Sequence, residues 1–170
     1  MNLLIINTTA ENDIETQTAI NKLTEKADKY KVINTSEFNI SHCIGCYVCM
    51  LQTPGICCLK DDYHIIFKSF LEYDNVIFVC DTAFGFVNHK MKNIADRSFP
   101  LATILTHFKD GEIRHIPRYN KSLNLYLLYK GDANQELLND WLNRYAINMA
   151  GKSLGAFPIS NFEEALKCIF

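Results

Sequence analysis

The sequence has no long apolar segment and no excess of positive charge. Its longest early apolar run, Leu3 to Ile6, is too short for a signal-peptide core, and no stretch reaches the roughly 18 apolar residues of a membrane span. Lys and Arg number 17 against 19 Asp and Glu, which gives a formal net charge of −2. We therefore expect a soluble, cytoplasmic protein that binds neither nucleic acid nor a membrane.

The signatures of several enzyme classes are also missing. There is no G-x-x-x-x-G-K-[ST] and no G-x-G-x-x-G, so the sequence supports neither a nucleoside triphosphatase nor a dinucleotide-binding Rossmann enzyme. The five histidines show no H-E-x-x-H or other ligand spacing. The stretch 109–121 is mildly basic, which is typical of solvated surface, although it could also meet a nucleotide phosphate.

Cysteine is too scarce for a disulfide scaffold but strongly clustered. Seven cysteines in 170 residues are about 4%, below the roughly 8–10% typical of disulfide-rich chains, and five of them lie between Cys43 and Cys58. In a reducing compartment such clustering favours metal or redox chemistry over disulfides. Cys80 and Cys168 fall in expected core positions, where thiols are inert.

What the sequence does contain is an alternation of strands and helices. Hydrophobic residues make up 48% of the chain, enough for one domain over 1–170 with a buried core. Strands are predicted at 2–7, 30–34, 75–80, 123–129 and 152–157, and helices beginning near 12, 62, 88, 132 and 161 separate or follow them. This pattern predicts an α/β fold, a doubly wound, mostly parallel five-stranded sheet with helices on both faces, in three layers.

In such sheets ligands bind beyond the carboxyl ends of the strands, which here lead into 7–18, 81–88 and 130–133. The first segment offers hydroxyl and amide groups at the start of a helix, where a phosphate can be held: Thr8, Thr9, Asn12 and Thr16. An ordinary helix N-terminus is equally compatible with it, because Glu11, Asp13 and Glu15 would repel a dianion. In the second segment, Phe84 and Phe86 could flank a flat heteroaromatic ring or simply pack within the loop.

The cysteine loop at about 43–58 contains the pattern C-x₂-C-x₂-C-x₇-C, formed by Cys43, Cys46, Cys49 and Cys57. Cysteines spaced by three in a tight loop can direct their thiolates at one 4Fe-4S cluster. Zinc also accepts four thiolates, and Cys58 could replace Cys57 as a ligand. The remaining alternative is that the reduced thiols only pack in the loop as small hydrophobic groups.

These motifs occur together in a known order: the C-x₂-C-x₂-C loop, the pair Asp61-Asp62, the strand 75–80, Gly85 and the helix 92–97. The chain resembles the NADPH-dependent FMN reductase family of flavodoxin-like proteins, in particular its iron–sulfur flavoprotein branch. The resemblance implies a flavodoxin-like sheet of order 2-1-3-4-5, one FMN per subunit and a homodimer or homotetramer. It also implies a cysteine motif that in some members holds a four-iron cluster near the subunit interface.

The resemblance assigns the family's cofactor contacts to particular residues of this chain. The phosphate loop falls on 7–16, where the hydroxyls are kept and the family's Pro and Arg are absent. The ring-flanking loop falls on Asp81, Thr82, Ala83, Phe84 and Gly85, with the Gly and an aromatic kept and the family's Pro and Tyr absent. Lys92, Asp96 and Arg97 match a helix motif that we interpret as structural or interface-forming.

The leading hypothesis is an NAD(P)H-dependent, FMN-binding oxidoreductase that passes electrons to a small-molecule or protein acceptor. The cofactor performs the redox chemistry, so no catalytic acid, base or nucleophile is required of the protein. One alternative is a flavodoxin-like electron-transfer or sensor module that does not oxidise NAD(P)H. Another is a degenerate family member that has lost FMN.

Overall fold

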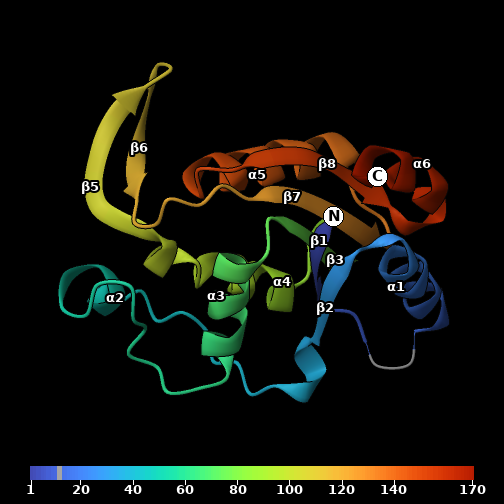
Figure 1. Cartoon of the computed structure of the whole chain (residues 1–170), viewed down its shortest axis with the longest axis horizontal. Helices are drawn as coiled ribbons and strands as arrows, with labels where there is room; N and C mark the ends of the chain where they lie inside the picture. Colours follow the sequence, from blue (N-terminus) through green and yellow to red (C-terminus); the bar gives the residue numbers. More distant parts are fainter. Residues whose placement is uncertain (11–12) are drawn as a thin grey trace.

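The computed structural model describes residues 1–10 and 13–170, and its centre is a sheet of five parallel strands (Figure 1). The strands are β1 (Asn2–Asn7), β2 (Lys29–Asn34), β3 (Asn75–Ala83), β7 (Asn124–Lys130) and β8 (Lys152–Pro158). They lie in the order β2-β1-β3-β7-β8, all parallel. Counted along the parallel strands alone, this is 2-1-3-4-5, so the predicted fold and strand order are confirmed.

Helices cover both faces of the sheet, which makes the three predicted layers. One face is covered by α1 (Ile14–Lys26) and α6 (Phe162–Ile169), and the other by α3 (Tyr63–Glu72), α4 (His89–Asp96) and α5 (Gln135–Asn148). Side chains of β1 alternate between the two cores: Leu3 and Ile5 contact the first, Leu4 and Ile6 the second. All four are fully buried, which explains why this strand is a continuous apolar run.

Short elements connect these layers. They are α2 (Val48–Leu51), β4 (Phe86–Val87) and three 3-10 turns at Thr35–Glu37, Phe99–Leu101 and Ile159–Asn161. The strand β3 runs to Ala83, three residues beyond the predicted end, because β4 pairs back on it antiparallel. Asn88 begins α4 as expected, its side chain accepting a hydrogen bond from the backbone N of Met91 over 2.8 Å.

A two-stranded hairpin, absent from the sequence-based prediction, projects away from the sheet (Figure 1). It consists of β5 (Ala102–Lys109) and β6 (Glu112–Pro117), joined at Asp110 and Gly111, whose φ angles of 52° and 81° favour a tight hairpin turn. The stretch 109–121, expected to be solvated surface, contains β6 of this arm, and the arm as a whole exposes large apolar side chains, among them Leu105, Phe108 and Ile113. No helix within the described residues is long and apolar enough to cross a bilayer.

Candidate functional site

The hydroxyl groups that directly follow β1 are turned toward the protein. Thr8 and Thr9 are both buried. The Thr8 Oγ1 donates to the carbonyl oxygen of Val79 over 3.1 Å, and the Thr9 Oγ1 and backbone N donate to Asn7 Oδ1 over 2.8 and 3.0 Å. The predicted contact Asn12 lies outside the described residues. Neither described hydroxyl has its proton free for a ligand in this arrangement.

A carboxylate caps the first turn of α1. Asp13 accepts a hydrogen bond from the backbone N of Thr16 over 3.3 Å and another from the Thr16 hydroxyl, so the third described hydroxyl is engaged as well. Lys130, at the end of β7, contacts Asp13 and lies 3.4 Å from the Glu15 carboxylate. The hydrogen bond from Lys130, followed by that from Thr16, lowers the pKa of Asp13, and the same contact with Asp13 raises the pKa of Lys130. An acid and a base thus already compensate each other where a phosphate would be held.

The loop expected to face a flat ring is exposed. The Phe84 side chain is fully exposed, and its φ of 53° together with the φ of 75° at Gly85 turns the chain sharply between β3 and β4. Ala83 is exposed, and Thr82 is half-buried with its Oγ1 donating to the carbonyl oxygen of Lys130 over 3.3 Å. An exposed aromatic face held by a non-Gly residue at positive φ is unusual, and such backbone often occurs at binding sites.

The three loops at the carboxyl ends of β1, β3 and β7 do meet at one edge of the sheet. The Asp81 carboxylate accepts a hydrogen bond from the backbone N of Ala10 over 3.2 Å, which joins the first loop to the second. Gly85 pairs with Ala133 in an isolated bridge, which joins the second to the third. The edge therefore has the arrangement at which open α/β sheets bind their ligands.

At this edge the residues suit the ring of a flavin better than its phosphate. The exposed Phe84 and the backbone around it offer a surface for a flat ring. At the other end, the carboxylates of Asp13 and Asp81 accept the backbone N–H groups that a phosphate would need. Lys130 is a cation at this end that could turn from Asp13 toward a phosphate, so the fit depends on breaking that contact.

The cysteine loop folds around a small cavity. Five cysteine side chains line this cavity of about 30 Å³: Cys43, Cys46, Cys49, Cys57 and Cys58. All are free thiols, and the Sγ atoms of Cys46 and Cys58 are 3.5 Å apart. The other two cysteines lie elsewhere. Cys80 is buried in β3, where desolvation raises its pKa to about 12, whereas Cys168 is exposed on α6, so its predicted core position was wrong.

Two residues between the first three cysteines of the loop have left-handed backbone. Gly45 and Tyr47 have φ angles of 64° and 55°, a conformation that few residues other than glycine adopt. A hydrogen bond from the Val48 backbone N, followed by one from Cys58, lowers the pKa of Cys46. Burial, followed by the neighbouring thiols, raises the pKa of Cys49. The thiols therefore influence one another across the cavity.

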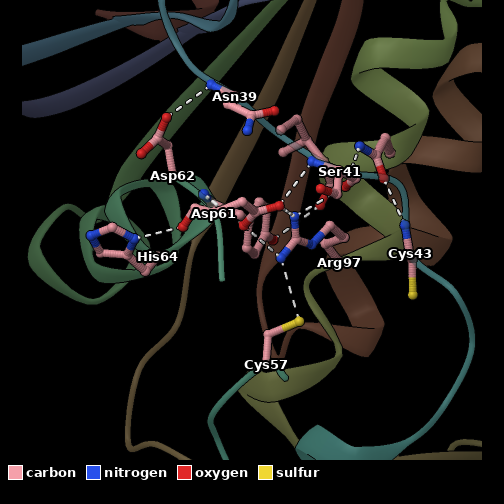
Figure 2. A network of polar contacts seen from close by, with 11 residues as sticks. Asn39, Ser41, Cys43, Cys57, Asp61, Asp62, His64 and Arg97 are labelled. Atoms are coloured by element: carbon pink, nitrogen blue, oxygen red, sulfur yellow. Dashed lines mark hydrogen bonds and ion pairs between the residues drawn. The ribbon is translucent and has the colours of Figure 1, made fainter. Parts of the chain in front are cut away.

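One arginine fixes the cysteine loop to the end of α4 (Figure 2). The Arg97 guanidinium makes a two-pronged contact with the Asp61 carboxylate, donates to the carbonyl oxygen of Ser41 over 3.0 Å, and reaches the Cys57 Sγ over 3.4 Å. The Arg97 and Asp61 side chains are only 1% and 3% exposed. Burial alone would raise the pKa of Asp61, but the hydrogen bonds from Arg97 and the Ser41 backbone N outweigh it and lower the pKa. Arg97 thus has a structural role, one of the two interpretations of the helix motif given above.

Two further contacts attach the ends of this loop. Asn93 on α4 accepts a hydrogen bond from the Cys43 backbone N over 3.1 Å and donates to the Ser41 carbonyl oxygen over 3.0 Å. The Asp62 carboxylate accepts from the backbone N of Asn39 over 2.8 Å (Figure 2). The pair Asp61-Asp62, which the sequence showed only as part of the resemblance, therefore holds the segment that leads into the cysteine loop.

The cysteine set suits a thiolate-bound metal in its chemistry. Iron–sulfur clusters and structural zinc both take thiolate ligands, and five thiols border one cavity. Within residues 1–10 and 13–170, however, no three His, Cys, Asp or Glu side chains already converge as metal ligands. Holding a metal would therefore require side-chain rotations within the loop.

Fold and site together define a flavodoxin-like protein with a cysteine loop beside its sheet. No family model matches the sequence. The sequence is 32% identical over 83 residues to an iron–sulfur flavoprotein of Methanocaldococcus jannaschii, and 32% identical over 79 residues to an iron–sulfur flavoprotein of Archaeoglobus fulgidus. These matches cover 49% and 46% of this chain but 42% and 36% of the two relatives, so the chain matches less than half of each relative's length. They support the resemblance to iron–sulfur flavoproteins noted from the cysteine loop.

Solved structures share the fold at low sequence identity. An NAD(P)H:quinone oxidoreductase from Methanothermobacter marburgensis superposes with a TM-score of 0.62 at 11% identity, covering 99% of this chain and 95% of that one. RosB with a bound riboflavin-phosphate intermediate superposes with a TM-score of 0.64 at 15% identity, covering 93% of this chain and 64% of that one. General stress protein 14 of Treponema denticola in complex with FMN superposes with a TM-score of 0.54 at 11% identity, covering 99% of this chain and 94% of that one. The flavodoxin-like fold is thereby established.

Proposed function

We propose that this chain is an NAD(P)H-dependent, FMN-binding oxidoreductase of the iron–sulfur flavoprotein type. The observation that carries the proposal is that five cysteine side chains border one cavity in a flavodoxin-like fold. The names of the two sequence relatives and of the flavin-binding structural neighbours support it. A cytoplasmic location, where thiols stay reduced, suits a site built from free cysteines.

The proposal assigns two groups of residues to two cofactors. FMN, which supplies hydride acceptance and electron transfer when bound, would have its ring on Thr82, Ala83, Phe84 and Gly85. Its phosphate would approach the segment with Thr8, Thr9, Asn12 and Thr16, where Lys130 supplies positive charge. A 4Fe-4S cluster would take its ligands from Cys43, Cys46, Cys49 and Cys57, with Cys58 as a replacement for Cys57.

A second candidate function rests on the carboxylates at the phosphate end. Because Asp13 and Asp81 accept the N–H groups that a phosphate would use, a protein that has lost FMN and keeps only the cysteine site is also compatible with this edge. Such a protein would carry electrons or sense redox state without oxidising NAD(P)H. It predicts that added FMN leaves the melting temperature unchanged, whereas binding at a hundredfold excess over Kd should add about 2.7 kcal/mol of stability.

We also propose that a second copy of the chain covers the projecting hairpin. Phe108 and Ile113 are 76% and 75% exposed, and they pair directly across β5 and β6. Exposed apolar strands that extend from the body of a protein are unfavourable in water and commonly pair or pack with another chain. A homodimer or homotetramer built through this arm would bury them.

The experiment that tests the proposed function is an absorption spectrum of protein purified without oxygen, with iron, zinc and extractable flavin counted in the same sample. We expect flavin, about four irons per chain, and NAD(P)H oxidation when ferricyanide is added. Cys46→Ser should remove the iron, while the control Cys168→Ser, on the exposed surface of α6, should retain it. Unchanged iron in Cys46→Ser would contradict the cluster assignment, and absence of flavin after adding FMN would favour the second candidate.

A further inference from the structure

A pocket that neither proposed cofactor uses lies beside the cysteine loop. Its volume is about 740 Å³, within the range of about 300–1,000 Å³ typical of small-molecule sites. Phe67 and Leu71 of α3 form one wall and Tyr119 another, with the rings of Phe67 and Tyr119 packed edge to face at 6.1 Å between centroids. Most of the lining is apolar, which suits a flat hydrophobic molecule.

The charges around this pocket favour an anion. Asp61 is compensated by its buried contact with Arg97. The remaining charged residues of the lining are two lysines, Lys60 and Lys68, and one carboxylate, that of Asp62. The lining therefore has an excess of one positive charge. A ligand with a single acidic group would complement it.

A hydrogen-bond donor at the wall is left without a partner. Both terminal nitrogens of Arg97 are used, by Asp61, Ser41 and Cys57. The Arg97 Nε is buried and has no hydrogen-bond partner within the described residues, although Arg97 lines the pocket. The guanidinium also lies over the Tyr63 ring, 4.3 Å from its centroid, so this wall of the pocket is held by Asp61, Ser41, Cys57 and Tyr63 together.

The pocket also borders the cysteine cavity. Cys57 and Leu59 line both, so the two spaces share a wall. A molecule in the pocket would therefore lie against the residues that border the proposed cluster site. That position is suited to a molecule that exchanges electrons there.

We propose that this pocket binds the electron acceptor, an aromatic quinone that carries one acidic substituent. Its role as acceptor rests on the proposed function, whereas its binding does not. In the overall reaction, NAD(P)H and one proton supply the two electrons and two protons that convert the quinone to its hydroquinone, leaving NAD(P)⁺. The apolar walls would hold the ring, and Lys60 and Lys68 would attract the acidic group.

Calorimetric titration with anthraquinone-2-sulfonate tests this binding site, using the full chain with its cysteines reduced. We expect saturable binding at one site, and weaker binding of benzenesulfonate, which has the charge without the extended ring. Leu71→Trp, which fills the pocket, should weaken binding at least about tenfold. Lys60→Glu and Lys68→Glu should each weaken it about fivefold, while the control Lys90→Glu, an exposed lysine outside this pocket, should leave it unchanged.

The outcomes separate the pocket from the proposed function. If Leu71→Trp and both lysine reversals bind the probe as the wild type does, with melting temperatures showing that they are folded, the pocket assignment is wrong. The same holds if the wild type does not bind the probe at all. Binding that is lost in these variants supports the assignment even if the protein oxidises no NAD(P)H, a result that would count against the proposed function alone.

Discussion

Breaking the ion pair between Arg97 and Asp61 should strongly destabilise the protein. We expect Asp61→Asn to lower the free energy of unfolding by about 3–5 kcal/mol, the usual effect of leaving one member of a buried pair uncompensated. The structure places the effect in this range because both side chains are almost inaccessible to water. The Asp61 oxygens also accept the backbone N–H groups of Ser41 and Tyr63 over 2.8 and 3.2 Å, and the asparagine NH₂ would oppose one of these donors.

Urea denaturation of the metal-free, reduced protein measures this effect. Asp96→Asn is the matched control, because Asp96 pairs with Lys92 on the same helix but both side chains are 45% exposed. The control should change the free energy of unfolding by no more than about 1 kcal/mol. If Asp61→Asn costs as little as Asp96→Asn, the reasoning that the buried pair holds the cysteine loop to α4 is refuted.

The same pair predicts how stability depends on pH. The pKa of Asp61 is lowered from its ordinary 3.8, so its contribution is fully present above that value and is lost as the pH falls through the lower, folded-state pKa. The difference in unfolding free energy between wild type and Asp61→Asn should therefore be constant near neutral pH and shrink below pH 3.8. A difference that grew on acidification would contradict the assigned direction.

Three further changes have defined outcomes. Asp13→Asn should strengthen FMN binding in a fluorescence titration, because it removes a negative charge from the proposed phosphate end and frees Lys130; unchanged or weaker binding would argue against that location. The double change Phe108→Lys and Ile113→Lys should shift the protein toward monomer in sedimentation experiments, and an unchanged mass would exclude the hairpin as the contact. Gly131→Ala should lower stability by about 1–3 kcal/mol in thermal melts, since a φ of 111° is strained for alanine and its Cβ would lie 2.4 Å from the Thr82 Oγ1; a neutral effect would contradict this reasoning.

The sheet could be predicted because its central strands are buried on both faces. Runs such as 76–80 are continuous and apolar, a pattern that is typical of strands buried on both faces. The hairpin could not be predicted in that way. Its strands lie away from the core, so most of their side chains are exposed and burial imposes no alternating pattern on the sequence.

The candidate site was predictable in residue type but not in orientation. The spacing of the cysteines indicated one shared site, and five of their side chains do border one cavity. The sequence also showed the hydroxyls of Thr8, Thr9 and Thr16, but not which atoms accept their hydrogen bonds. The acceptor of Thr8 is the Val79 carbonyl oxygen, which only the fold brings near it. The hydroxyls of Thr9 and Thr16 donate to side chains two and three residues earlier in the chain, which take the place of a ligand. The pocket beside Arg97 depends on residues from α3 and from the segments on either side of the hairpin, and no local motif combines them.

The helix α4 contacts both halves of the proposed redox site. At its beginning, Asn88 donates to the carbonyl oxygen of Thr8 over 3.1 Å, next to the first loop of the sheet edge. At its end, Arg97 holds the cysteine loop. Eight residues of α-helix span about 12 Å, so α4 acts as a rigid spacer of fixed length between the two. Electron tunnelling weakens steeply with separation, and here the separation would be set within one chain, independently of how any partner docks.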